Sequence, residues 1–385
     1  MNLKDKIADF QGLKTPFFYY DMALLQKTLD EVKRCIQGTN FHVHYALKAN
    51  VNKPILELIR DNGLGADCVS GNEVKRALET GFDPGSIVFA GVGKTDDEIS
   101  YALDQRIFAF NCESVQELQV INEMAGQKGI VANVALRLNP NVDPETHQYI
   151  TTGLKDNKFG ISLKGLDEVF ASHSKWENIN IEGIHFHIGS QVTKLVKYEE
   201  LSDRVNGLIN HFEEKGIELS YINLGGGLGI DYENPEENSI APFESYFDVF
   251  KKHLKIKRNT AVHFELGRSI VGQCGTLLTK VLYSKEAETT NFLIVDAGMT
   301  ELLRPALYQA HHEIRNLSAS EGEKTYDVVG PICETSDFFR KEVKLPISNR
   351  GDLVAILSAG AYAEVMASHY NLREKAPAVY STDFH

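Results

Sequence analysis

One lysine lies where a buried strand should end, a position in which its amine can act as a nucleophile. Lys48 follows the mostly apolar stretch 41–47 and precedes Ala49 and Asn50. Desolvation at such a place favours the neutral amine, which can form a Schiff base with a carbonyl compound. The alternative is a lysine that only reaches from a strand end toward solvent, and Lys48 taken alone does not decide between the two.

Further polar residues follow later apolar stretches in the same way. They are Asp67, Arg137, the group His185, His187 and Ser190, and Glu265 followed by Leu266, Gly267 and Arg268. A carboxylate buried at a strand end needs a partner. If Glu265 faces a pyridine nitrogen, it keeps that nitrogen protonated and makes the ring an electron sink. A salt bridge to Arg268 is the alternative, and the two contacts do not exclude each other. His187 can stack on a flat ring, although a lone histidine is more often a hydrogen-bonded core residue.

Three consecutive glycines could hold an anion. Gly225, Gly226 and Gly227 follow the apolar stretch that begins at Tyr221. Clustered glycines allow backbone N–H groups to converge on a phosphate, and the Ser190 hydroxyl is a candidate further donor. A flexible turn explains the same glycines equally well, so this signal is weak by itself.

A cysteine and a glutamate stand side by side in GPICETSD (330–337). A lone internal cysteine such as Cys333 is usually a small apolar filler. Here a Gly-Pro turn precedes it, and the acidic residues Glu334 and Asp337 follow it. These neighbours favour a functional role for Cys333 and Glu334.

The elements that would position these residues repeat eight times. The strand-like stretches are 41–49, 63–70, 86–91, 106–111, 134–140, 181–188, 221–227 and 261–266. The helical patterns between them include 72–80, 95–104, 114–126, 198–216 and 242–254, with apolar residues at three- and four-residue spacing. Eight alternating units predict an α/β fold of the (β/α)8 TIM-barrel type, with a doubly wound open sheet as the competing assembly. In such a barrel the active site lies at the C-terminal ends of the strands, where the polar residues described above occur.

The chain changes character after about residue 270. Strand-like stretches there follow one another mostly without helices, which predicts a C-terminal all-β domain, sandwich-like or barrel-like, ending in one helix at 361–370. The stretch 15–22 is also strand-like and could pair with this domain. We therefore expect a barrel over 23–268 and a β domain formed by 1–22 and 269–385.

Composition excludes several classes of function. The 385 residues carry a formal net charge of -13, which disfavours binding to nucleic acid or to an anionic membrane. No apolar run is long enough to span a membrane, and the N-terminal stretch lacks the apolar segment of a signal peptide, so a cytoplasmic protein is expected. The five cysteines are scattered without a CxxC pair, which predicts neither a disulfide framework nor a metal site. A small-molecule partner is the favoured interpretation.

Nine motifs in this order resemble one enzyme family. They are YALKAN (45–50), GADCVSGNE (65–73), TTGLKDNKFGI (151–161), HFHIGSQ (185–191), NLGGGLGI (223–230), ELGRS (265–269), DAGMTELLRPALY (296–308), GPICETSD (330–337) and GAY (360–362). The chain resembles the fold-type III pyridoxal-phosphate-dependent decarboxylases, and within them the diaminopimelate decarboxylases, over nearly its whole length. One departure is Leu266, where many relatives have proline.

The resemblance implies a cofactor site for pyridoxal 5'-phosphate. Lys48 would bind the cofactor covalently, His187 would stack on its ring, and Glu265 would contact its pyridine nitrogen. Asp67 would belong to the same site. The phosphate would be held by Ser190, Gly225, Gly226 and Gly227, the backbone of Leu266, Gly267 and Arg268, and nearby Tyr362.

The resemblance also implies a substrate and a homodimer. Arg268, Arg304 and Tyr308 would bind a distal carboxylate, Glu334 would bind a distal amine, and Tyr362 would lie close by. Cys333 would donate a proton from the second subunit of a dimer with shared active sites. The implied reaction is decarboxylation of meso-2,6-diaminopimelate to L-lysine and carbon dioxide.

Other functions remain open at this point. A decarboxylase of ornithine, arginine or carboxynorspermidine would need no clamp for a distal α-carboxylate, and an enzyme similar to alanine racemase would lack a reason for it. A carrier that only binds the cofactor would need the barrel alone. A non-catalytic barrel would leave Lys48, Glu265 and Arg304 without purpose.

Overall fold

The computed structural model describes residues 3–140, 158–172 and 175–384, and the chain forms two compact units. The first unit comprises Leu29–Gly229 and Pro242–Gly267, and the second comprises Met1–Thr28, Ile230–Ala241 and Arg268–His385. Most of the motif at 151–161 lies outside the described residues.

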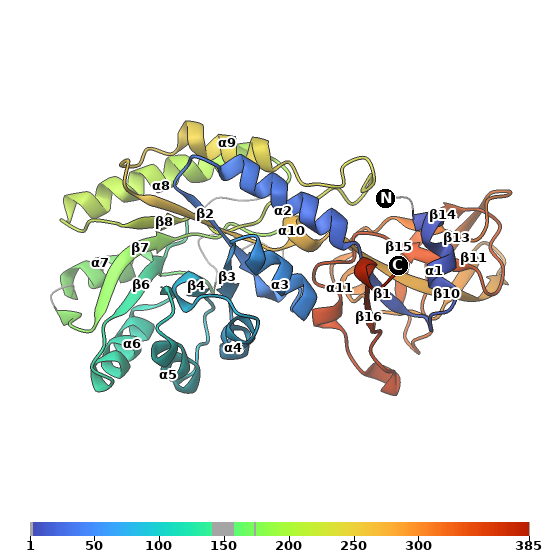
Figure 1. The fold of residues 1–385 in the computed structure, drawn as a ribbon, viewed down its shortest axis with the longest axis horizontal. Helices are drawn as coiled ribbons and strands as arrows, with labels where there is room; N and C mark the ends of the chain where they lie inside the picture. The colour runs from blue at the N-terminus through green and yellow to red at the C-terminus, as the bar shows by residue number, and fades with distance from the viewer. Residues whose placement is uncertain (1–2, 141–157, 173–174, 385) are drawn as a thin grey trace. The chain divides into compact units, whose positions relative to one another are not determined.

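The first unit is a closed parallel barrel of eight strands (Figure 1). Its strands are β2 (Phe41–Ala46), β3 (Gly65–Cys68), β4 (Ile87–Phe89), β5 (Ala109–Cys112), β6 (Ala132–Arg137), β7 (Ile179–His185), β8 (Tyr221–Asn223) and β9 (Ala261–Leu266). Each strand pairs with the next in the chain, and β9 pairs with β2. The predicted TIM barrel is confirmed, and the open-sheet alternative is wrong because β9 closes onto β2.

Helices alternate with these strands and lie around the outside of the barrel (Figure 1). They are α3 (Lys53–Asp61), α4 (Gly71–Glu79), α5 (Asp96–Gln105), α6 (Val115–Gln127), α7 (Leu163–Ser172), α8 (Val196–Glu214) and α9 (Phe243–His253). Several begin at a side-chain cap that satisfies a backbone N–H of the first turn. Ser70 accepts from the Glu73 amide, and Thr95 forms a capping box with Glu98. The helical stretches predicted from spacing are confirmed in these positions.

A layer of aromatic and imidazole rings fills the barrel near the amino-terminal ends of its strands. The rings of His44 and His263 stack 5.0 Å apart, and a hydrogen bond of 2.7 Å joins His44 Nε2 to His263 Nδ1. Phe108 stacks on His263, and Tyr221 contacts both rings. Burial lowers the pKa of His44 to about 4, so this pair stays neutral near pH 7. The layer is therefore a packed, uncharged plug.

The second unit is built mainly of strands. They are β1 (Phe17–Tyr20), β10 (Gly275–Glu286), β11 (Asn291–Val295), β12 (Ile314–Asn316), β13 (Lys324–Val329), β14 (Phe338–Leu345), β15 (Leu353–Ile356) and β16 (Ala378–Tyr380). The sheet runs β12-β15-β10-β11-β13-β14, and β1 pairs with β10 and β16. The expected pairing of stretch 15–22 with the C-terminal strands is thus confirmed, while β12 and β16 were not predicted. Helix α2 (Met22–Ile36) follows β1, and α1 (Ile7–Phe10), α10 (Arg268–Val271) and α11 (Arg304–Tyr308) are short.

The prediction of a helix at 361–370 is wrong. Only a single 3-10 turn, Glu364–Met366, lies within this stretch, and a second, Tyr370–Leu372, begins at its last residue. Tyr362 has a left-handed backbone with φ +56°, and the Ser368 amide donates to the carbonyl of Thr300, 68 residues earlier in the chain. Backbone contacts with distant segments therefore override the helical spacing of the apolar residues.

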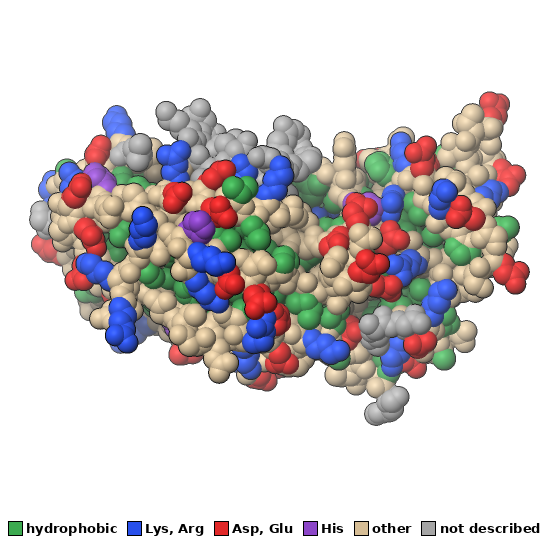
Figure 2. Space-filling view, turned by 90° about the horizontal axis from the view of Figure 1, so that it is seen from above, with side chains coloured by type: hydrophobic (Ala, Val, Ile, Leu, Met, Phe, Trp, Pro, Cys, Tyr) green, Lys and Arg blue, Asp and Glu red, His purple; other side chains and the backbone are tan. Residues whose placement is uncertain are grey.

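The surface carries both signs of charge. On the face shown in Figure 2, Lys and Arg side chains are interspersed with Asp and Glu rather than gathered into one basic patch. None of the helices in the described part of the chain is both long and apolar enough to cross a membrane.

A substitution at Gly360 tests how closely two backbone segments of the second unit pack, those at residues 271 and 360. A Cβ at Gly360 would lie 1.8 Å from the carbonyl oxygen of Val271, so Gly360→Ala should lower the free energy of unfolding by at least about 1–3 kcal/mol, the usual cost of overpacking. Gly12→Ala is the control, because a Cβ there meets nothing within 4 Å. Thermal melting of both variants measures the effect; equal melting temperatures would show that this contact relaxes freely.

Candidate active site

A lysine and an aspartate meet at the carboxyl ends of the first two barrel strands. Lys48 lies in the 3-10 turn Leu47–Ala49 that follows β2, and its Nζ is 3.5 Å from Asp67 Oδ2 on β3. The Lys48 side chain is 36% exposed, whereas that of Asp67 is fully buried. The amine is therefore accessible from the open end of the barrel, and the carboxylate holds it from below.

Burial dominates the ionisation of Asp67. It raises the pKa of Asp67 to about 7; the nearby Glu265 carboxylate adds to the rise, and the Lys48 ammonium opposes it. Asp67 Oδ1 has no hydrogen-bond partner among the described residues. A buried carboxylate in this state has unused capacity for a polar group of a ligand.

Glu265 is held by three side chains from other barrel strands. Its Oε1 accepts hydrogen bonds from Asn111 Nδ2 at 2.9 Å and from Asn223 Nδ2 at 2.8 Å. Its Oε2 is 3.0 Å from His185 Nε2. Burial alone would raise the pKa of Glu265, but His185 and the Lys48 ammonium lower it below its usual range. Glu265 is thus an anion at the centre of the barrel.

These contacts leave Glu265 one open acceptor position. A carboxylate offers about four lone-pair sites. Two on Oε1 are taken by the asparagines, and one on Oε2 is taken by His185. The remaining site on Oε2 suits a single additional donor such as a protonated ring nitrogen.

Asn111 and Asn223 were not singled out from the sequence. Asn111 is the last residue of the predicted strand 106–111, Asn223 lies within the predicted strand 221–227, and both are fully buried. That position was the only available signal, because their common partner Glu265 lies 154 and 42 residues away along the chain. His185, by contrast, was among the residues noted at strand ends.

His187 is held in a defined tautomer. Its Nδ1 accepts a hydrogen bond of 3.3 Å from the amide of Gly226, so the proton of the neutral ring is on Nε2. Burial lowers the pKa of His187 well below its usual value, and the cations Lys48 and Arg137 lower it further. A neutral, fixed imidazole of this kind can stack on a flat ring.

The glycine trio is required by close backbone packing. A Cβ at Gly226 would lie 1.8 Å from the Glu265 carbonyl oxygen, and one at Gly225 would lie 2.1 Å from that of Phe186. Gly225 and Gly227 also have left-handed backbones, with φ +65° and +106°. The trio is therefore a rigid part of the barrel end, not a flexible turn.

Two amides of the trio already have acceptors inside the barrel. The amide of Gly225 donates to Asn223 Oδ1 at 2.9 Å, and that of Gly226 donates to His187. Gly227 and the half-buried Ser190 are the remaining members of the predicted phosphate group on this side. Leu266 is buried, and a Cβ at Gly267 would touch Ala49 at 3.0 Å, so the end of β9 packs against the turn that carries Lys48.

Arg137 has a structural partner. Its Nη1 is 2.5 Å from Glu113 Oε1, and Glu113 Oε2 accepts from the amide of Gly160. Both side chains are buried. Glu113 thus links Arg137, at the end of β6, to Gly160.

In the second unit, two guanidinium groups are gathered around one tyrosine. Arg268 Nη1 donates to the Tyr232 hydroxyl at 2.6 Å, and the Arg304 guanidinium lies 4.9 Å from the centre of the Tyr232 ring. Arg268 also lies 4.8 Å from the ring of Tyr362. Both arginines are buried, at 6% and 5% exposure. Burial alone would raise the pKa of Tyr232, but the two arginines lower it.

Neutral groups hold Arg304 in place. Its Nη1 is 2.8 Å from His312 Nε2, and His312 Nδ1 is 2.8 Å from the carbonyl oxygen of Leu357. Because Nδ1 must donate to that carbonyl, Nε2 accepts from the guanidinium. Burial lowers the pKa of His312 well below its usual value, with Arg304 adding to the effect. Two buried cations next to neutral partners have the charge to bind an anionic group of a ligand.

Tyr308 lies half-buried at the end of α11, four residues after Arg304. Of the residues gathered here, the sequence singled out Arg268, Arg304, Tyr308 and Tyr362 but not Tyr232 or His312. Both missed residues lie in loops, where no periodic pattern distinguishes them.

The loop with Cys333 is exposed in the single chain. Cys333 and Glu334 are both exposed, and the Cys333 amide donates to Asn371 Oδ1 at 3.1 Å. The interpretation of Cys333 as a residue packed inside its own domain is therefore wrong. Asp337 is buried and accepts from the amides of Ile332 and Met299, so it shapes the loop instead of facing a ligand.

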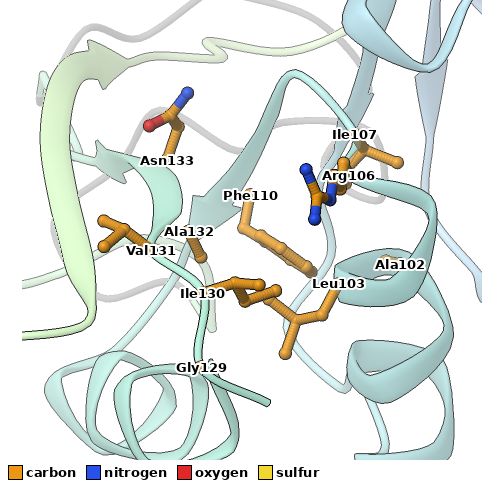
Figure 3. A pocket seen from close by; sticks show the side chains of 10 residues that line it. All are labelled: Ala102, Leu103, Arg106, Ile107, Phe110, Gly129, Ile130, Val131, Ala132 and Asn133. Carbon is orange, nitrogen blue, oxygen red and sulfur yellow. The ribbon is translucent and has the colours of Figure 1, made fainter. Parts of the chain in front are cut away.

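A cavity of about 370 Å³ opens at the other end of the barrel (Figure 3). It lies near the amino-terminal ends of β5 and β6 and is lined mainly by apolar side chains, with Arg106 and Asn133 as its polar members. None of the predicted site residues lines it. The chemistry of the chain is therefore assigned to the carboxyl ends of the strands.

Asp67 should give the cofactor-free protein a distinct pH dependence. Its folded pKa of about 7 exceeds the value of about 3.9 in an unfolded chain, so the folded state binds more protons between these limits. Its contribution to stability therefore falls as pH rises from about 4 to 7, by roughly 1.4 kcal/mol per pH unit at most. Asp67→Asn should remove this slope, and Asp203→Asn, at an exposed position, should retain it. Melting temperatures across pH 4–8 provide the measurement; parallel curves for Asp67→Asn and the parent would contradict the assignment.

Comparison with known proteins identifies the family. The model for "pyridoxal-dependent decarboxylase, pyridoxal binding domain" matches residues 22–272. The chain is 50% identical to a diaminopimelate decarboxylase of Bacteroides thetaiotaomicron over 98% of both chains, and 41% identical to one of Aquifex aeolicus over 96% of this chain and 87% of that protein. The crystal structure of diaminopimelate decarboxylase from Helicobacter pylori complexed with L-lysine is 42% identical, with a TM-score of 0.93 over 98% of this chain and 94% of that one. The relatives named above are diaminopimelate decarboxylases, and the chain belongs to the pyridoxal-dependent decarboxylases.

Proposed function

We propose that this chain decarboxylates meso-2,6-diaminopimelate to L-lysine and carbon dioxide with pyridoxal 5'-phosphate bound to Lys48. The observation that carries the proposal is the pair of buried guanidinium groups, Arg268 and Arg304, among neutral partners. An amino acid with a second carboxylate is the substrate that such a pair suits. The named relatives support the same substrate.

The residues at the barrel end fit the cofactor. Lys48 offers a partly exposed amine, and Glu265 offers an oriented carboxylate with one open acceptor site. His187 offers a neutral ring, and Asp67 offers an unsatisfied buried oxygen. When bound, pyridoxal phosphate supplies the electron sink that accepts the bonding electrons of the departing carboxylate.

Each of these residues then has a task. Glu265 holds the proton on the ring nitrogen, and its own charge is held by Asn111, Asn223 and His185. Lys48 would hold the cofactor through its amine. Ser190 and Gly227 would donate to the phosphate, together with the backbone of residues 266–268 and with Tyr362.

The second unit is proposed to select the substrate. Arg268 and Arg304, with Tyr308, bind the distal carboxylate. Residues 267 and 268 are joined by a peptide bond, so Arg268 directly follows the end of β9, which carries Glu265.

We further propose a cytoplasmic homodimer with shared sites. Cys333 would donate the proton to the product carbon, and Glu334 would bind the distal amine, both from the second subunit. Their exposure in the single chain supports a role toward a partner, because a buried pair could not reach one. The net charge of -13 supports small-molecule substrates over nucleic acid or membranes as partners.

Decarboxylases of ornithine, arginine or carboxynorspermidine remain the alternative. Carbon dioxide release from meso-diaminopimelate should exceed that from each of these by at least about a hundredfold, since a site built for a charged group strongly rejects substrates without it. Lys48→Ala should be inactive and still folded, and borohydride should fix the cofactor to the peptide with Lys48 in the parent protein. Preference for ornithine or arginine would overturn the proposed substrate; reduction onto another lysine would overturn the anchor.

Glu265→Gln tests the carboxylate that faces the ring nitrogen. The amide keeps the shape but loses the charge, so the chemical step should slow by at least about tenfold, which corresponds to roughly 1.4 kcal/mol in the barrier. Cofactor affinity should change less. Single-turnover kinetics separate the two quantities, and an unchanged rate would make Glu265 a purely structural residue.

Complementation tests the shared site. Lys48→Ala and Cys333→Ala subunits, each nearly inactive alone, are mixed, dissociated and allowed to reassociate. In mixed dimers one of the two sites contains both Lys48 and Cys333, and about half of all dimers are mixed. Activity should therefore approach a quarter of the parent value. No recovery, with subunit exchange demonstrated by differently tagged chains, would place Cys333 and Lys48 of one site in the same subunit.

A further inference from the structure

Asn223 lies between two parts of the proposed cofactor site. Its Nδ2 donates to Glu265 Oε1 at 2.8 Å, and its Oδ1 accepts from the amide of Gly225 at 2.9 Å. The first contact holds Glu265, the carboxylate proposed to face the ring nitrogen. The second contact holds the glycine trio, which is proposed to lie beside the phosphate.

The orientation of this side chain is forced by its neighbours. The Gly225 amide can only donate, and the ionised Glu265 carboxylate can only accept. Turning the Asn223 amide over would place two acceptors together and two donors together. Because Asn223 is fully buried, water does not relieve either mismatch.

The same loop is tied to the stacking histidine and to β9. The amide of Gly226 donates to His187 Nδ1, and the Glu265 amide donates to the carbonyl oxygen of Gly225 at 2.8 Å. Asn223 therefore closes a ring of hydrogen bonds that includes the backbone and the side chain of Glu265. Displacing Asn223 shifts the trio and the carboxylate together.

Asn111 provides an internal comparison. It is equally buried and donates to the same oxygen, Glu265 Oε1, at 2.9 Å. Its Oδ1 has no hydrogen-bond partner among the described residues. Asn111 thus shares one of the two contacts of Asn223 and does not bind the trio.

We propose that Asn223 is a positioning residue that couples the phosphate cradle to the ring-nitrogen carboxylate. This inference rests on the proposed function only in that pyridoxal phosphate binds at Lys48. Loss of Asn223 weakens recognition of the phosphate and of the ring, whereas loss of Asn111 weakens recognition of the ring alone.

The test compares two ligands that differ only in the phosphate. Cofactor-free protein is titrated with pyridoxal phosphate and with pyridoxal. The dissociation constant of pyridoxal divided by that of pyridoxal phosphate measures phosphate recognition, and a lower ratio means weaker recognition. Asn111→Ala should weaken both ligands and keep this ratio within about twofold of the parent. Asn223→Ala should lower the ratio about tenfold, the effect of one lost buried hydrogen bond on the cradle.

Asn223→Asp provides a second variant and a safeguard against misfolding. A carboxyl oxygen still accepts from Gly225, so the ratio should stay near that of the parent, while both affinities fall because Glu265 gains an acidic neighbour. Melting temperatures confirm that each variant folds. A parent-like ratio in Asn223→Ala, or a reduced ratio in Asn111→Ala or Asn223→Asp, overturns the coupling. Failure of the parent protein to bind pyridoxal phosphate would instead overturn the proposed function.

Discussion

The buried negative charge of Glu265 is the constraint on which the rest of the barrel site depends. An ionised carboxylate without partners is very costly inside a protein. Its partners here come from three other strands: Asn111 lies in β5, His185 ends β7 and Asn223 ends β8. All three can reach it only when β9 closes the barrel in the observed register. The closed barrel is thus what allows Glu265 to stay ionised. The glycine trio belongs to the same arrangement, because Asn223 bonds both Glu265 and Gly225.

The two units divide the charges of the proposed chemistry. The barrel supplies two carboxylates, Asp67 and Glu265, near one amine. The other unit supplies two guanidinium groups that share the Tyr232 ring and hydroxyl. An aromatic face attracts cations, so Tyr232 lets two like charges lie near each other without a carboxylate between them. That arrangement keeps the guanidinium charges available for a ligand, which a protein carboxylate would otherwise neutralise.

Much of the fold was predictable because local patterns determine it. Eight apolar stretches with amphipathic segments between them were enough for the barrel, and Lys48, Asp67, His187 and Glu265 fall together because strand ends do. The spacing pattern failed where contacts between distant segments determine the conformation. Residues 361–370 have helical spacing, yet Tyr362 has a left-handed backbone and the Ser368 amide donates to Thr300. Asn111, Asn223, Tyr232 and His312 were missed for the same reason. Each gains its role from a partner that the local sequence does not reveal.

The ring layer of His44, His263, Phe108 and Tyr221 fills the barrel interior on the amino-terminal side of Glu265. Side chains two residues apart on a strand face the same way, so His263 and Tyr221 lie one step below Glu265 and Asn223. Three of its four rings are buried, its two histidines have lowered pKa values, and the rings stack on one another. Glu265 therefore faces the opposite mouth of the barrel, at the carboxyl ends of the strands. The barrel behaves as a cup and not as a tube, and a ligand seated in that mouth isolates the carboxylate from solvent on both sides.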